Sequence, residues 1–123
     1  MNETDNKRLS KETARLIFAA FDEKKAEDIA VLEIAGLSPL ADYFVIATSK
    51  NKAQTDALVY ACAAGAEKNG AKIIYAEGQD AHGWTLLDFG DVLAHIFAPK
   101  ERAFYDLERL WADAKRIEGE FAV

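Results

Sequence analysis

Asp88 and Asp91 are the residues of this chain whose type and spacing could support catalysis. They flank Gly90, so a hairpin turn could bring both carboxylates to neighbouring positions at its tip. Paired carboxylates can hold Mg²⁺ or divide acid and base roles between them. The same residue types are also what a tight turn requires, since Asp bonds its own backbone and Gly tolerates a positive φ. We favour the turn interpretation and keep the metal site as the alternative.

The two histidines and the single cysteine lack the partners that a metal site or a nucleophile requires. His95 lies inside an apolar run and is expected to be a half-buried, hydrogen-bonded residue on a sheet face. His82 stands beside Gly83 in a predicted loop, and no second or third ligand occurs at a zinc spacing. Cys62 falls on an apolar helical stripe, where a buried thiol is inert. The sequence therefore predicts no catalytic residue, no metal and no cofactor.

Thr48 and Ser49 end a predicted strand just before a helix, which is a place where phosphates do bind in proteins. The segment ATSKNKAQ contains no glycine, however, so its backbone is not free to wrap a phosphate as a P-loop does. Asn51 is well placed to cap the following helix. The segment predicts a capped helix start and does not favour nucleotide binding.

Trp84 begins a predicted strand, and two interpretations of it stay open. A tryptophan that starts a strand is usually part of the core. Near a hairpin edge with Tyr75, His82 and Phe89, it could instead form an exposed aromatic patch of the kind that anchors protein interfaces. Trp111 belongs to a helical stripe, for which a core position is expected.

Hydrophobic periodicity places these residues on a succession of helices and strands. Helices are predicted after Ser10, after Asn51 and from Pro99, and strands over residues 28–34, 43–48, 71–77, 84–88 and 92–97. The last two strands are separated by Phe89, Gly90 and Asp91, which is a hairpin signal. Strand, helix and strand before them predict a βαβ unit with parallel strands and a right-handed crossover. The order α-β-β-α-β-β-β-α predicts an α/β fold with one mixed sheet flanked by helices.

The two ends of the chain are expected to contribute least to this domain. Residues 1–10 are polar and predicted to be flexible, residues 11–116 form the single domain, and residues 117–123 are a short, loosely attached tail. The helix from Pro99 is expected to bury one apolar stripe against the sheet. Its members are Phe104, Leu107, Leu110, Trp111 and Ala114.

Length and charge limit the class of protein. A chain of 123 residues suits one domain. With a formal net charge of -6, the protein is repelled by phosphate backbones. We therefore expect a basic partner and no dependence on nucleic acid. One cysteine is compatible with a reducing compartment, and no stretch reaches the roughly 18 apolar residues of a membrane span. These features predict a cytoplasmic protein that does not associate with membranes.

Several motifs of the chain resemble the ribosomal silencing factor family, also called the Iojap or RsfS family. The resemblance runs from about Asp28 to Trp111, and the segments that carry it are DIAVLEI, DYFVIAT, the Glu77–Gly78 pair, GWTLLDFGDVLAHIF and RAFYDLERLW. It implies a small α/β fold related to nucleotidyltransferases but without their activity. Where relatives show T-G-x-S-x-R-Q, this chain has residues 48–54 without the glycine, a serine and the arginine, which further disfavours nucleotide binding.

The resemblance also implies a function that needs no catalysis. Such factors bind a large-subunit ribosomal protein of the L-fourteen family, sterically block association with the small subunit under nutrient limitation, and often form homodimers. The family's contact surface carries onto Trp84, Leu87, Asp88 and Phe89 of this chain. The alternative is a nucleotidyltransferase-like nucleotide-binding protein or enzyme that uses Asp88 and Asp91.

Overall fold

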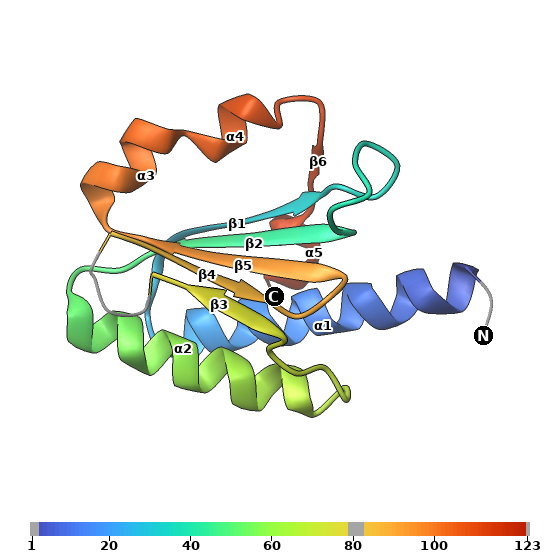
Figure 1. The fold of residues 1–123 in the computed structure, drawn as a ribbon, viewed down its shortest axis with the longest axis horizontal. Helices are drawn as coiled ribbons and strands as arrows, with labels where there is room; N and C mark the ends of the chain where they lie inside the picture. Colours follow the sequence, from blue (N-terminus) through green and yellow to red (C-terminus); the bar gives the residue numbers. More distant parts are fainter. Residues whose placement is uncertain (1–2, 79–82, 123) are drawn as a thin grey trace.

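A six-stranded mixed β-sheet forms the centre of the computed structural model, which describes residues 3–78 and 83–122 (Figure 1). The strands are β1 (Glu27–Glu33), β2 (Tyr43–Thr48), β3 (Tyr75–Glu77), β4 (Trp84–Asp88), β5 (Val92–Phe97) and β6 (Lys115–Arg116). The helices are α1 (Glu3–Glu23), α2 (Lys52–Glu67), α3 (Pro99–Tyr105), α4 (Leu107–Leu110) and α5 (Glu118–Phe121). In Figure 1, α1 and α2 cover one face of the sheet, and α3 and α4 lie over the other. The predicted α/β class with one mixed sheet is confirmed.

Strand β2 occupies the interior of the sheet, whose order is β3-β4-β5-β2-β1-β6. All of its residues are buried, as the apolar run of residues 43–48 predicts for a strand covered on both faces. It runs parallel to β5, from the Tyr43–Val92 pair to the Thr48–Phe97 pair, and antiparallel to β1. The predicted hairpin of β4 and β5 is confirmed, with Trp84 opposite Phe97 and Asp88 opposite Leu93.

The predicted βαβ unit is wrong in one respect, which is the position of β3. This strand runs in the same direction as β2, because it is antiparallel to β4, which in turn is antiparallel to β5. However, β4 and β5 lie between β2 and β3, so the two are not neighbours. Strand β5 is buried along almost its whole length, which suits the interior, whereas Tyr75 and Glu77 of β3 are exposed, which suits an edge.

Helix α1 begins earlier than predicted, at Glu3 and not after Ser10. Ser10 lies within the helix at 3% exposure, and its hydroxyl donates to the carboxylate of Asp42 over 2.8 Å, so it is not the N-cap. Residues before it are polar but compatible with a helix, and Arg8 forms an ion pair with Asp5 one turn away. Neither α1 nor any other helix in the described ranges is long and apolar enough to cross a membrane.

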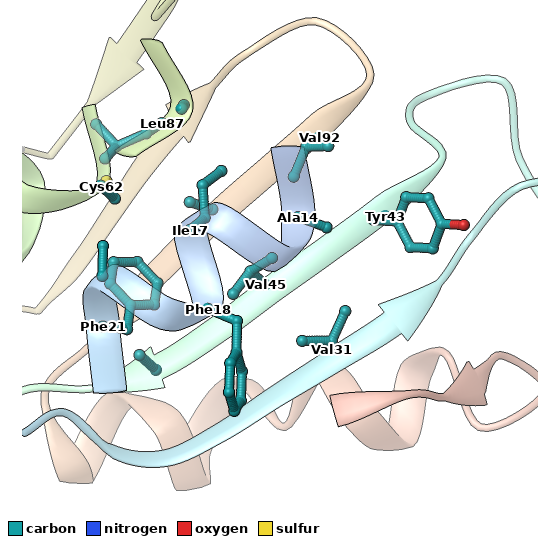
Figure 2. Packing of buried hydrophobic residues seen from close by; sticks show 14 of the residues in the cluster. Ala14, Ile17, Phe18, Phe21, Val31, Tyr43, Val45, Cys62, Leu87 and Val92 are labelled. Atoms are coloured by element: carbon teal, nitrogen blue, oxygen red, sulfur yellow. The ribbon is translucent and has the colours of Figure 1, made fainter. Parts of the chain in front are cut away.

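The larger hydrophobic core lies between the sheet and helices α1 and α2. Figure 2 shows Ile17 and Phe21 of α1 directed at the strands, together with Val45 of β2 and Cys62 of α2. The side chains of Ile17, Phe21, Val45 and Cys62 are all fully buried. Leu87 of β4 belongs to the same core, also at 0% exposure (Figure 2).

The last predicted helix is two short helices, because the chain turns at Asp106. The φ of this residue is 47°, a left-handed conformation that Asp tolerates better than most residues and that ends α3. The turn changes the helical phase, so the predicted apolar stripe is wrong for Phe104 and Leu110, which are 79% and 74% exposed. Leu107 and Ala114 are buried, as predicted, in a second core on this face of the sheet.

The expectation that the end of the chain is loosely attached is also wrong. Strand β6 pairs with β1, and Ile117 is 2% exposed in the larger core. The carboxylate of Glu118 accepts a hydrogen bond from the N–H of Val31 over 2.9 Å, and the ring of Phe121 lies 5.9 Å from that of Phe18. These contacts connect α5 to β1 and α1.

Candidate functional site

The two aspartates at the hairpin tip form a turn, as favoured from the sequence. The carboxylate of Asp88 accepts a hydrogen bond from the N–H of Gly90 over 2.7 Å, and the φ of Gly90 is 96°. Phe89 and Val92 close the turn with a backbone hydrogen bond of 2.9 Å. The carboxylate of Asp88 is therefore used in the turn itself.

The carboxyl of Asp91 faces a different neighbour from that of Asp88. Burial, with a further contribution from the charge of Asp42, raises the pKa of Asp91 above its usual range. The backbone carbonyl of Asp91 accepts a hydrogen bond from the N–H of Asp42 over 2.7 Å. Within residues 3–78 and 83–122, no group of three or more His, Cys, Asp or Glu side chains could hold a metal ion.

The four residues proposed to contact a partner divide between the two faces of the sheet. Leu87 is 0% exposed and Phe89 is 7% exposed, and both belong to the core under α1 and α2. Trp84 and Asp88 are half-buried, and the alternation of side chains along β4 directs both to the opposite face. Their partner-contact role stays a prediction, and the structure leaves Trp84 and Asp88 as the two whose side chains reach the surface.

Trp84 packs among aromatic rings on the face covered by α3 and α4. The centroid of its ring lies 4.6 Å from the ring centroid of Tyr105, 5.0 Å from that of Phe97 and 6.0 Å from that of His95. Phe44 and Trp111 extend the group, at 5.4 Å from each other. We call these six residues the aromatic cluster: Phe44, Trp84, His95, Phe97, Tyr105 and Trp111. The neighbours expected from the sequence are different, since Phe89 lies on the other face, Tyr75 lies on β3, and His82 lies outside the described residues.

An exposed apolar rim borders the aromatic cluster on α3 and α4. Its members are Phe104, Tyr105 and Leu110, with exposures of 79%, 42% and 74%. These side chains line a shallow groove together with Asp106 and Arg109. Large apolar side chains gathered at one exposed place are typical of a surface that binds another protein. Trp84 lies under Tyr105 and so joins the rim to the sheet.

Arg102 holds α3, and with it the apolar rim, in place. Its guanidinium donates to the hydroxyl of Thr48 over 2.9 Å and to the carboxylate of Glu108 over 2.7 Å. The arginine side chain is 12% exposed, so this ion pair is shielded from solvent. Burial alone would raise the pKa of Glu108, but the hydrogen bonds and charge of Arg102, together with a backbone hydrogen bond and the charge of Arg116, lower the pKa below its usual value. The pair connects the end of β2 to both short helices.

The segment expected to cap α2 does so, and its hydroxyls are engaged within the protein. Asn51 accepts a hydrogen bond from the N–H of Gln54 over 2.8 Å, as predicted for an N-cap. The hydroxyl of Ser49 accepts from that of Thr55 over 2.7 Å and donates to the carbonyl of Asn51 over 2.9 Å. Thr48 accepts from Arg102. These groups serve the packing of α2 and α3 rather than an open phosphate site.

Cys62 is a core residue, as predicted. Its side chain is 0% exposed, and burial raises the pKa of the thiol to about 12. A thiol in this state is a poor nucleophile because it does not ionise at neutral pH.

His95 is more deeply buried than predicted, at 4% exposure. The hydrogen bond expected of it is present, since its Nδ1 accepts from the indole Nε1–H of Trp84 over 3.1 Å. Burial lowers the pKa of the imidazole to about 3, so the ring is neutral at physiological pH. His95 is thus a structural member of the aromatic cluster.

Sequence reasoning missed the apolar rim because it assigned Phe104 and Leu110 to a buried stripe. The signal that could have revealed it is Asp106, whose side chain favours helix starts and left-handed turns over helix interiors. A helix boundary there separates Phe104 and Tyr105 from the stripe that begins at Leu107.

Comparison with known proteins identifies similar chains. The model of a family described as "Ribosomal silencing factor during starvation" matches residues 7–122. The ribosomal silencing factor RsfS of Bacillus subtilis is 38% identical over 113 residues, which cover 92% of this chain and 96% of that protein. The chloroplastic protein Iojap of Zea mays is 41% identical over 99 residues, which cover 80% of this chain and 43% of that protein.

Two solved structures of bacterial proteins have the same fold. A crystal structure of a protein from Chromobacterium violaceum superposes with a TM-score of 0.79 at 31% identity, covering 84% of this chain and 86% of the other. One from Bacillus halodurans superposes with a TM-score of 0.74 at 34% identity, covering 87% and 97%. The similarity therefore extends through the sheet and its helices.

Proposed function

Because this chain belongs to the ribosomal silencing factor family, we propose that it binds the large ribosomal subunit through a ribosomal protein of the L-fourteen family. The bound protein occupies space that the small subunit needs, and so represses translation under nutrient limitation. The observation that carries the proposal is the exposed apolar rim above the aromatic cluster, at Phe104, Tyr105 and Leu110. A surface of this kind is suited to a protein partner.

Trp84 and Asp88 complete the proposed contact surface on the β4 side of the aromatic cluster. The rings of Trp84 and Tyr105 pack against each other, with centroids 4.6 Å apart and planes tilted by 47°, so Trp84 adjoins the apolar rim. Asp88 can offer its second carboxylate oxygen to a basic side chain, because one oxygen is engaged by Gly90 in the turn. Leu87 and Phe89 contribute indirectly, by packing the strand and turn that present these side chains.

Charge supports a basic partner. The chain carries 21 acidic and 15 basic side chains and a formal net charge of -6. An acidic protein associates faster with a basic ribosomal protein than a neutral one does, and it is repelled by exposed RNA phosphates. We therefore place the contact on ribosomal protein and not on ribosomal RNA.

The proposed mechanism is steric and needs no reaction. The curated relatives carry the name of a silencing factor, which is a regulatory role. Inhibition by occupied space depends on affinity and on the concentration of the factor, so the fraction of blocked subunits follows the fraction of occupied ones. We extend the proposal to a cytoplasmic location, where bacterial ribosomes are found, and to a homodimer in the free state.

Co-sedimentation with separated ribosomal subunits tests the partner. The protein is expected to pellet with large subunits and with the isolated L-fourteen-family protein, and to stay in the supernatant with small subunits. Trp84→Ala should weaken binding by on the order of 2 kcal/mol, or about 30-fold, if its thermal unfolding midpoint shows that it remains folded. Retention on small subunits, or no retention on large ones, would overturn the proposal.

A further inference from the structure

His95 lies at the centre of the aromatic cluster rather than at its border. Its ring centroid is 4.8 Å from that of Phe44, 6.0 Å from that of Trp84 and 6.2 Å from that of Phe97, with which it is parallel to within 6°. The residue occupies the interior strand β5 opposite Leu86 of β4 and beside Ile46 of β2. A polar ring is therefore placed where an apolar residue would pack without any loss of hydration.

The hydrogen bond to Trp84 fixes the protonation pattern of this ring. An indole N–H can only donate, so the Nδ1 of His95, 3.1 Å from the indole Nε1, must present a lone pair. The proton of the neutral imidazole is then on Nε2. That nitrogen is buried and has no hydrogen-bond partner among the described residues. Among the described residues, this buried donor is thus unsatisfied, which destabilises the fold.

The hydrogen bond between His95 and Trp84 offsets part of this cost. Without it the indole N–H would face an apolar environment of Phe97 and Tyr105 rings. The bond removes that penalty in one ring orientation only, because donor and acceptor must align. In that orientation the Trp84 ring lies beneath Tyr105, whose side chain is 42% exposed in the apolar rim.

We propose that His95 is a positioning residue for the ribosome-binding surface: its Nδ1 holds the indole of Trp84 in the orientation that supports Tyr105 and the apolar rim. The inference depends on the function proposed above. It also specifies how the partner meets Trp84. Since the indole N–H is already engaged, the partner contacts the ring through its carbon atoms, by apolar packing or by stacking of a cationic side chain, and receives no hydrogen bond from it.

Two substitutions at His95 separate its hydrogen bond from its volume. His95→Phe keeps an aromatic ring of similar size but has no acceptor. His95→Asn is smaller, but its Oδ1 is attached to Cγ as Nδ1 is and can accept the indole N–H. We expect His95→Phe to lower affinity for purified large subunits by about tenfold, the scale of one hydrogen bond, and to speed solvent exchange of the Trp84 indole N–H. His95→Asn should bring both values back towards those of the unmodified protein.

The outcomes distinguish this inference from the proposed function. If Trp84→Ala and Tyr105→Ala weaken binding while folded His95→Phe binds like the unmodified protein, the positioning role of His95 is overturned. The proposed ribosome-binding surface is then still supported. If Trp84→Ala and Tyr105→Ala both bind normally, the surface itself is wrong. Should His95→Phe fail to fold, ¹⁵N spectra of the unmodified protein still decide. A proton on Nε2 and a slowly exchanging Trp84 indole N–H support the inference, and a proton on Nδ1 contradicts it.

Discussion

Leu87 and Trp84 belong to one short strand, yet they serve different parts of the molecule. Side chains alternate between the two faces of a sheet, so Leu87 enters the core under α1 and α2, while Trp84 joins the aromatic cluster under α3. Residues that are close in sequence on this strand therefore do not share one surface of the protein. Of the four residues that the hairpin motif suggested for partner contact, Leu87 and Phe89 are buried in the core under α1 and α2, and Trp84 and Asp88 are half-buried on the opposite face.

Leu87 is expected to matter for stability. Leu87→Ala removes a fully buried side chain and leaves a cavity, so we expect the free energy of unfolding to fall by roughly 2–5 kcal/mol in urea titrations. Leu110→Ala is the matched control, because Leu110 is 74% exposed, and it should change stability by less than about 0.5 kcal/mol. In binding the order is reversed, since Leu110 belongs to the apolar rim. A stable Leu87→Ala protein that binds large subunits poorly would contradict this assignment.

His95 should make stability depend on pH. Burial lowers its pKa from about 6.5 to about 3 in the folded protein, so between these values the unfolded chain binds a proton that the folded chain does not. Stability is then complete above pH 6.5 and falls as the pH is lowered, by about 1.4 kcal/mol per pH unit. From pH 7 to pH 5 we expect a loss of about 2 kcal/mol in chemical denaturation.

His95→Asn is the control for this pH dependence, because asparagine does not titrate. His82 is present in both proteins, so its contribution cancels when their profiles are subtracted. The two proteins should differ in slope between pH 5 and pH 7 and run parallel above it. Equal slopes would show that His95 does not titrate as its burial requires.

At the scale of elements, the short helices α3 and α4 expose the apolar rim because the helical register changes at Asp106. The left-handed turn lets Leu107 face the sheet while Phe104 and Leu110 face solvent. Arg102 fixes the turn to the sheet through Thr48 and Glu108. A continuous helix over the same residues would have buried the apolar stripe that the sequence suggests.

The end of the chain is expected to contribute to stability through Ile117. Ile117→Ala deletes a side chain that is 2% exposed in the larger core, so the free energy of unfolding should fall by roughly 2–5 kcal/mol. Ile74→Ala alters the same residue type at a position that is 70% exposed and should have little effect. Thermal and urea denaturation check both. Equal stability of the two variants would indicate that residues after Arg116 are loosely attached after all.

Local signals were sufficient to predict the elements with strong periodicity or characteristic turns. The run of residues 43–48, the Asn51 cap and the hairpin around Gly90 each depend on neighbours in the sequence, and each is confirmed. The position of β3 at the edge depends on pairing between distant segments, which no local pattern reports. Strand β6 has two residues, too few for a period to be visible.

The candidate site was predictable only in part, for a related reason. The motif pointed to Trp84, but the aromatic residues that surround it come from β2, β5 and α3. Tyr105 and Phe104 are 21 and 20 positions from Trp84 in the sequence, and only the packing of α3 on the sheet joins them. The bond between Trp84 and His95 depends on the register of β4 with β5.

At the scale of the whole molecule, the sheet separates the larger core from the face proposed to bind the ribosome. Helices α1 and α2 cover one side of the sheet, and the short α3 and α4 lie over the other (Figure 1). The larger core lies under α1 and α2, whereas the side chains of the apolar rim on α3 and α4 are exposed. The charge of -6 favours encounter with basic ribosomal protein. In the proposed mechanism, this protein of 13.6 kDa blocks subunit joining by the volume it occupies on the large subunit.

Subunit association followed by light scattering tests the central claim most directly. The unmodified protein should reduce joining of large and small subunits in proportion to its occupancy of the large subunit. Phe104→Asp, in the apolar rim, should require at least about ten times more protein for the same effect. Tyr60→Asp is the matched control, since Tyr60 is 80% exposed against 79% for Phe104 but lies on α2, across the sheet. Full inhibition by folded Phe104→Asp, or loss of inhibition by Tyr60→Asp alone, would contradict the account.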